Sequence, residues 1–256
     1  MLLDNKVCIV AGAASTRGIG YATAELFARH GAKVVLVDVA IDEQSGPALE
    51  ASVRSAMHSD AQVLAIRCDI ANAEDCDRMV RAAVERFGTV DCLVNSAGIV
   101  RSGPLLDISE QEYDLVVDVN LKGAFNLCKS ALKHFMQQKS GVIVNVASAA
   151  AQRGGGLVGG AHYAAAKGGV VSLTRTIARE YGMHGIRANV ICPAMIETAM
   201  LDNLSDERLN GILEGIPLRR TGTTTEAAGV CLFLASELSA YVTGATVDVN
   251  GGSHIH

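Results

Sequence analysis

Short apolar runs alternate with longer amphipathic segments from one end of the chain to the other. The runs are rich in β-branched residues and almost continuously apolar, which is typical of parallel strands that are covered on both faces. Seven strands are predicted, at Val7–Val10, Lys33–Val37, Gln62–Ile66, Val90–Val94, Gly141–Val146, Ile186–Ile191 and Ala245–Val249.

The segments between these runs have helical periodicity. Helices are predicted at about 18–30, 42–58, 73–87, 109–138, 162–184 and 224–236. Two of them begin with a capping-box pattern, Ser109-x-x-Glu112 and Thr223-x-x-Glu226. Strands that alternate with helices through right-handed crossovers predict an α/β fold: a Rossmann-type doubly wound parallel sheet of about seven strands, with helices on both faces.

No linker, internal repeat or low-complexity segment interrupts this pattern. Residues 1–256 are therefore predicted to form a single dinucleotide-binding and catalytic domain. The one irregular region is 192–222, between the sixth strand and the last helix. A loop of that length in a compact domain is usually a lid or a substrate loop, and we expect a substrate loop here.

Composition narrows the classes of function. The net charge of −5 gives no support for binding nucleic acid or an anionic membrane, and no apolar run approaches the length of a membrane span. The first strand follows Met1–Lys6 at once, which leaves no room for a signal peptide. The seven cysteines lack a Cys-x-x-Cys pattern and fall mostly in apolar runs, as expected for reduced core residues of a cytoplasmic protein.

No cluster of zinc ligands is present in the sequence, so no metal site is predicted. His254 and His256 near the C-terminus remain open between a metal or partner contact and a loose surface end. A Ser-His-Asp hydrolase is disfavoured because no Gly-x-Ser-x-Gly elbow occurs.

A glycine-rich turn lies directly between the first strand and the first helix. Glycines there let the backbone turn tightly and approach a pyrophosphate, whose charge sits at the helix N-terminus. The turn therefore predicts a nucleotide site made by Gly12, Ser15, Arg17, Gly18, Ile19 and Gly20.

The end of the second strand bears on the choice of nucleotide. Asp38 can accept hydrogen bonds from both ribose hydroxyls of NAD and would repel the 2′-phosphate of NADP. Arg17 points the other way, since a base beside the glycine loop could hold that phosphate, unless it is simply solvated. Because the acid opposes the phosphate directly, NAD is favoured over NADP.

Tyr163 and Lys167 lie four residues apart, so on a helix they share one face. A lysine charge beside a phenol favours the phenolate and is expected to lower the tyrosine pKa, as a general acid/base at neutral pH requires. The pattern alone also arises by chance, on exposed helices that carry an aromatic residue and a cation.

Together, the glycine loop, Asp38 and the Tyr163/Lys167 pair make this sequence resemble the short-chain dehydrogenase/reductase family over essentially its whole length. Asn95-Ser-Ala-Gly98 is similar to the family's Asn-Asn-Ala-Gly element, and Pro193 to Thr198 is similar to the segment that holds the nicotinamide carboxamide. The further cofactor contacts that the resemblance implies are Val39, Cys68, Asp69, Ile70, Asn95, Ala97, Gly98, Tyr163, Lys167, Pro193, Ile196 and Thr198.

The resemblance also implies the catalytic roles. Tyr163 would exchange a proton with the substrate, Lys167 would tune the tyrosine, Ser148 would donate a hydrogen bond to the substrate oxygen, and Asn120 would hold a water near the lysine. The alternatives are structural: a strand-end serine that satisfies the backbone, and a mid-helix asparagine bonded to a nearby carbonyl. Thr198 has the alternative of a helix cap.

Two departures from the family pattern concern spacing. Gly12 and Gly18 are six residues apart where the family usually has four, and the segment from Ser148 to Tyr163 is about two residues longer, with a glycine-rich stretch at 154–160. No chemical group is lost by either change. The second one borders the substrate in the family, so an altered pocket is expected there.

The resemblance implies an enzyme that transfers hydride between a nicotinamide cofactor and a secondary alcohol or ketone. A sugar, polyol or hydroxy-acid dehydrogenase is favoured because NAD suits oxidation. A 3-oxoacyl-thioester reductase acting on acyl carrier protein is the alternative, and a catalytically silent nucleotide-binding regulator is the alternative of another class. A homotetramer is also implied, with the helices near 109–138 and 162–184 pairing across one interface.

Overall fold

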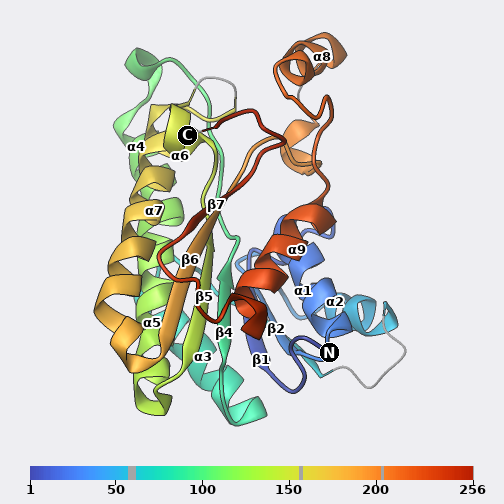
Figure 1. Cartoon of the computed structure of the whole chain (residues 1–256), viewed down its shortest axis with the longest axis vertical. Helices are drawn as coiled ribbons and strands as arrows, with labels where there is room; N and C mark the ends of the chain where they lie inside the picture. Colours follow the sequence, from blue (N-terminus) through green and yellow to red (C-terminus); the bar gives the residue numbers. More distant parts are fainter. Residues whose placement is uncertain (57–61, 156–157, 203–204, 256) are drawn as a thin grey trace.

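A parallel sheet of seven strands forms the centre of the computed structural model, in the order β3-β2-β1-β4-β5-β6-β7 (Figure 1). The structure describes residues 1–256 except 57–61, 156–157, 203–204 and 256. The α/β doubly wound fold is thus confirmed. The strands are β1 (Val7–Ala11), β2 (Lys33–Asp38), β3 (Val63–Arg67), β4 (Cys92–Asn95), β5 (Gly141–Val146), β6 (Ile186–Pro193) and β7 (Thr246–Val249).

Helices cover both faces of the sheet, with α1, α2 and α9 on one side and α3, α5 and α7 on the other (Figure 1). The α-helices are α1 (Ile19–Arg29), α2 (Ser45–Ser55), α3 (Ala73–Phe87), α4 (Glu110–Val117), α5 (Gly123–Gln138), α6 (Ala150–Arg153), α7 (Ala161–Tyr181), α8 (Asp206–Glu214) and α9 (Thr224–Ala235). A π-helical turn, η2 (Asp118–Lys122), joins α4 to α5, and short 3₁₀ turns include η1 (Leu105–Asp107), η3 (Gly182–His184), η4 (Ala199–Leu201) and η5 (Glu237–Ser239).

The first strand shows why its sequence is apolar throughout. Val7 and Ile9 face the core that is shared with α3 and α5, whereas Cys8 and Val10 face the core that is shared with α1 and α9. Because successive side chains of a strand point to opposite faces, a strand between two helical layers must be apolar at every position. Each such burial contributes about 1.5–3 kcal/mol for a large aliphatic side chain.

The two predicted capping boxes differ in the structure. At α9, Thr223 accepts a hydrogen bond from the backbone of Glu226, and the Glu226 side chain returns one to the backbone of Thr223. At α4, Ser109 accepts from the backbone of Glu112, but the Glu112 carboxylate lies against His162. The helix start is capped in both cases.

The expectation of an irregular region over 192–222 was wrong. The strand β6 continues to Pro193, the turn η4 follows, and α8 begins after Ser205, whose side chain accepts a hydrogen bond from the backbone of Arg208. The helix was missed because α8 is short, contains Gly211 and carries only a few apolar residues. The predicted second helix also ends earlier, at Ser55, and positions 57–58 lie outside the described residues.

The strand order reverses direction between β1 and β4, which are neighbours although two strands separate them in sequence. In open α/β sheets, ligands bind beyond the carboxyl ends of the strands at such a switch point. In the part of the chain that the structure describes, no helix is long and apolar enough to cross a membrane.

Candidate active site

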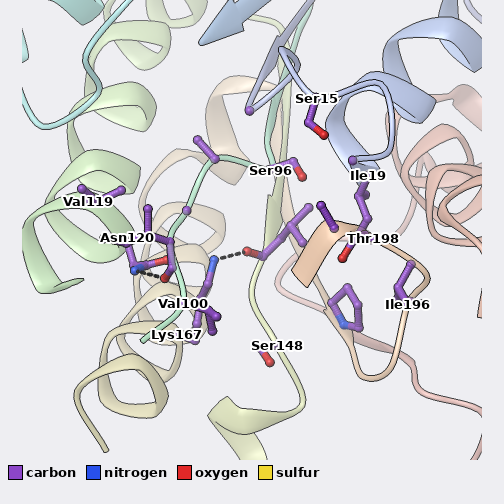
Figure 2. Close-up of a pocket in the computed structure, with 18 of the residues that line it drawn as sticks. Ser15, Ile19, Ser96, Val100, Val119, Asn120, Ser148, Lys167, Ile196 and Thr198 are labelled. Carbon is purple, nitrogen blue, oxygen red and sulfur yellow. Dashed lines mark hydrogen bonds between the residues drawn. The ribbon is translucent and has the colours of Figure 1, made fainter. Parts of the chain in front are cut away.

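A cavity of about 440 Å³ opens at the carboxyl ends of the central strands, and most of the predicted site residues line it (Figure 2). Those lining it are Gly12, Ser15, Arg17, Gly18, Ile19, Asp38, Val39, Cys68, Asp69, Ile70, Ala97, Gly98, Asn120, Ser148, Tyr163, Lys167, Pro193, Ile196 and Thr198. Gly20 and Asn95 do not line it. Gly20 lies beneath the glycine loop, and Asn95 is buried at the end of β4, where its amide donates to the Asn145 side chain.

The glycine loop packs so closely that two of its glycines admit no side chain. A Cβ on Gly12, whose φ is +80°, would lie 2.6 Å from the backbone nitrogen of Ala97. A Cβ on Gly20 would lie 2.2 Å from the carbonyl oxygen of Gly12. The loop and the first turn of α1 therefore form a backbone cradle of the kind that a pyrophosphate needs, and this cradle fits a dinucleotide.

Asp38 holds the loop as well as facing the cavity. Its Oδ2 accepts a hydrogen bond from the Ala14 backbone at 3.1 Å, and its Oδ1 accepts one from the Ala40 backbone at 3.1 Å. Each carboxylate oxygen keeps further acceptor capacity. The sequence suggested the ligand-facing role of this acid but not its bond to the inserted loop.

Arg17 forms a two-point ion pair with Asp202, with Nη1 2.8 Å from Oδ2 and Nη2 2.7 Å from Oδ1. Arg17 lies in the loop with the additional residues, and Asp202 directly follows η4. The sequence left Arg17 open between a solvated side chain and a phosphate ligand. The structure instead gives its guanidinium an acidic partner from the predicted substrate loop.

Asn120 sits in the π-helical turn η2, and π-helical turns inside α-helices occur frequently at functional sites. Its Nδ2 donates to the carbonyl oxygens of Ile99 and Val116, each at 2.9 Å, while its buried Oδ1 has no partner within the described structure. A Cβ on Gly98 would lie 2.6 Å from that Oδ1 and 3.2 Å from Lys167 Nζ. The Asn120 oxygen and the Lys167 ammonium thus lie so close to position 98 that only glycine leaves room for both.

Lys167 is buried beneath the cavity, and its Nζ donates to the carbonyl oxygen of Val146 at 2.9 Å (Figure 2). Burial lowers the pKa of Lys167 to about 8, because the protein interior disfavours the charged form. The Nζ atom lies 5.8 Å from the centroid of the Tyr163 ring. The two side chains therefore lie on the same face of α7, as their spacing predicts.

The expected direction of the Tyr163 pKa was wrong. Burial raises the pKa of this phenol, a hydrogen bond with Ser148 works in the lowering direction, and the nearby Cys192 adds to the rise. Desolvation of the phenolate therefore outweighs the neighbouring groups. In the described structure, Ser148 rather than Lys167 is the group that lowers this pKa.

Ser148 is oriented by the short helix α6. Its Oγ accepts a hydrogen bond from the Ala150 backbone at 3.1 Å, which leaves its own hydrogen for the hydrogen bond with Tyr163 at the cavity. His162 is buried and directed away from the cavity, with Nε2 3.2 Å from Glu112 Oε1 of α4. The adjacent histidine thus anchors the start of α7 and does not face the substrate side.

Sequence reasoning missed a set of apolar residues on the cavity wall. Two of them adjoin a predicted motif residue, and that adjacency was the only available signal; the other two do not adjoin one and gave no signal. They are Ile99, Val100, Val119 and Val158. Across the described ranges, no group of three or more His, Cys, Asp and Glu residues is placed to hold a metal ion, and His256 lies outside them.

Comparison with known proteins decides the family. A family model described as enoyl-(acyl carrier protein) reductase matches residues 12–254. An uncharacterized short-chain type dehydrogenase/reductase, y4mP, from Sinorhizobium fredii is 44% identical over 258 residues, which cover 100% of both chains. The chain belongs to the short-chain dehydrogenase/reductase family. It is an oxidoreductase that acts on carbonyl or CH–OH groups, and the family uses a nicotinamide cofactor.

Two further relatives of this short-chain dehydrogenase/reductase bear on its chemistry and shape. A protein from Thermotoga maritima named 3-oxoacyl-[acyl-carrier-protein] reductase FabG is 38% identical over 252 residues, covering 98% of this chain and 99% of its own. The crystal structure of gox2181 superposes with a TM-score of 0.92 at 33% identity, covering 98% of this chain and 96% of that one. The whole chain therefore shares the family's architecture.

Proposed function

We propose that this short-chain dehydrogenase/reductase is an NAD-dependent dehydrogenase of a small secondary alcohol. The observation that carries the proposal is the charge arrangement at the nucleotide end of the cavity. Asp38 faces the cavity with acceptor capacity to spare, and the arginine of the glycine loop, Arg17, is already paired with Asp202. An acid at this position, with the loop arginine paired elsewhere, favours ribose hydroxyls over a 2′-phosphate.

The cofactor's place follows from the cradle. The glycine loop would hold the pyrophosphate, Asp38 the adenosine ribose, Asp69 and Ile70 the adenine side, and Pro193 to Thr198 the nicotinamide side. When bound, a nicotinamide supplies the hydride chemistry of the reaction.

The chain's own groups supply the proton and the alignment. In oxidation, the Tyr163 phenolate takes the substrate's hydroxyl proton, and the Ser148 hydroxyl beside it donates to the substrate oxygen as charge changes there. Lys167 is fixed by Val146 beside the tyrosine, and the unpartnered Asn120 Oδ1 can accept from a water that links Lys167 to solvent. The apolar wall excludes other water from the reacting atoms.

Reduction of a 3-oxoacyl thioester is the second candidate, because relatives at 38% identity carry that name. It predicts the reverse direction, a preference for NADPH, and activity on an acyl-carrier-protein or pantetheine thioester. One screen separates the candidates: reduction of NAD or NADP, followed at 340 nm, over sugars, polyols, hydroxy acids and a 3-hydroxyacyl thioester. Activity confined to the thioester with NADP would overturn the first proposal. Binding of NADH without any turnover would instead indicate a silent regulator.

We also infer that the enzyme is a cytoplasmic homotetramer. All seven cysteines are free and buried, as suits a reducing compartment. Two of the regions that expose large apolar side chains are Tyr113, Leu115 and Phe125 on α4 and α5, and Phe233, Leu238 and Tyr241 around α9 and η5. Two such surfaces per chain fit a tetramer with two kinds of interface. Light scattering after size exclusion tests this, and a monomer would contradict it.

A further inference from the structure

A second, smaller cavity adjoins the catalytic serine. It measures about 30 Å³ and shares four lining residues with the main cavity, Ser148, Val158, Ala194 and Met195. The remaining lining residues are Ala149, Ala150, Arg153 and Gly154. We call this space the Ser148 annex; it extends the substrate side of the site, away from Asp38 and Asp69 at the nucleotide end.

Arg153 brings the only formal charge to the Ser148 annex among its described lining residues. It ends the short helix α6, five residues after Ser148, and it is exposed, so it stands at the rim. Its guanidinium makes no hydrogen bond or ion pair with any residue in the described ranges. By contrast, both cations among the described residues that line the main cavity are engaged, Arg17 with Asp202 and Lys167 with the Val146 carbonyl.

The size of the Ser148 annex limits what Arg153 can receive there. A cavity needs roughly 10–15 Å³ for each water-sized group, so this one admits about two oxygen atoms. A planar guanidinium with two parallel N–H donors matches a carboxylate better than a hydroxyl. A pantetheine chain needs more room than this cavity offers. A sugar or polyol carries no negative charge to pair with the Arg153 guanidinium.

We propose that the Ser148 annex is a carboxylate subsite, and that Arg153 selects hydroxy acids and oxo acids as substrates. The inference rests on the proposed function for the position of the reacting carbon. In the reaction, the carbinol C–H hydride reduces NAD to NADH, the hydroxyl proton passes to the Tyr163 phenolate, and the substrate becomes a ketone. The carboxylate stays unchanged on Arg153 throughout, so Arg153 is a specificity residue and not a proton carrier.

Binding of butyrate and butyramide tests the subsite without turnover. The two probes have nearly the same shape and differ in charge, and their dissociation constants follow from ligand-observed NMR on the protein with and without NADH. The wild type is expected to bind butyrate about ten- to a hundredfold more tightly than butyramide, the range of a charge-assisted hydrogen bond. Arg153→Gln is expected to abolish that difference, and Arg179→Gln, on the exposed face of α7, is expected to preserve it.

Turnover provides the second arm. With 3-hydroxybutyrate and its methyl ester as alternative substrates, Arg153→Gln is expected to raise KM for the acid and leave kcat/KM for the ester unchanged. A wild type that does not distinguish butyrate from butyramide, or an Arg153→Gln variant that keeps the distinction, overturns the subsite. Failure of every alcohol in the screen, with the butyrate preference present and dependent on Arg153, overturns the proposed function and leaves the subsite standing.

Discussion

Arg17 on the glycine loop and Asp202 after η4 form a two-point ion pair although 185 residues separate them in sequence. Both side chains are about half exposed or more, so the pair adds little to overall stability. Its consequence is instead local, because it occupies the loop arginine, which could otherwise bind a 2′-phosphate.

Asp202→Asn is therefore expected to increase the use of NADP relative to NAD by roughly three- to tenfold, the effect of one partly solvated charged hydrogen bond. The ratio of kcat/KM for the two cofactors measures it. The double variant Asp202→Asn with Arg17→Gln is the matched control and should return the ratio toward that of the wild type. An unchanged ratio in the single variant would show that Arg17 does not reach the phosphate.

Asp38→Ala is expected to move the same ratio further toward NADP, by tenfold or more, because it removes the charge that opposes the phosphate and the acceptor for the ribose. Asp38→Asn separates the charge from the loop contact, since an amide oxygen can still accept from Ala14. If Asp38→Asn shifts the ratio as far as Asp38→Ala does, the charge of Asp38 determines the cofactor preference. If neither variant shifts the ratio, Asp38 serves only the loop.

Ser148→Ala is expected to lower kcat by about 10²–10³, the usual loss for one donor to a developing charge. The hydrogen bond with Ser148 lowers the pKa of Tyr163, so its loss raises that pKa. The rising limb of log(kcat/KM) for oxidation should therefore move to higher pH. Ser148→Thr keeps the hydroxyl, so its rising limb should lie at the same pH as that of the wild type. An unchanged rising limb in Ser148→Ala would show that Ser148 does not lower the pKa of Tyr163.

Lys167→Met is expected to change how stability depends on pH. Burial lowers the pKa of Lys167 to about 8 from 10.5, so between these values the unfolded chain binds more protons than the folded chain. The wild type should therefore gain stability relative to Lys167→Met as pH rises from about 8 to 10.5, by about 3 kcal/mol in all. Denaturant unfolding at several pH values measures the difference. A difference between the two proteins that stays constant from pH 8 to 10.5 would contradict this effect of burial on Lys167.

The sequence was sufficient for the sheet and for most of the residues that line the cavity because both depend on local patterns. Continuous apolar runs predict covered strands, and the glycine turn, Asp38 and the Tyr163/Lys167 spacing each lie within one motif. The long-range relationships were not predictable. Nothing local in the sequence joins Arg17 to Asp202, or places Oδ1 of Asn120 against Gly98.

The wrong prediction for the pKa of Tyr163 also arose because the sequence shows only local relationships. The spacing places Lys167 on the same helical face as Tyr163, but it does not show how deeply the two side chains are buried. Burial is what raises the pKa of Tyr163 and lowers the pKa of Lys167. The helix α8 was missed for a different reason. It is short and has too few apolar residues to show a helical periodicity in the sequence.

The turnover of Tyr163→Phe, measured beside its binding of NADH, tests whether Tyr163 is the residue that transfers the proton. The phenyl ring keeps the packing and loses only the group that exchanges the proton, so kcat is expected to fall by about 10²–10⁴ while NADH affinity stays within a fewfold of the wild type. Turnover close to that of the wild type, with the protein folded and NADH bound, would contradict the assignment of Tyr163 as the proton-transfer residue.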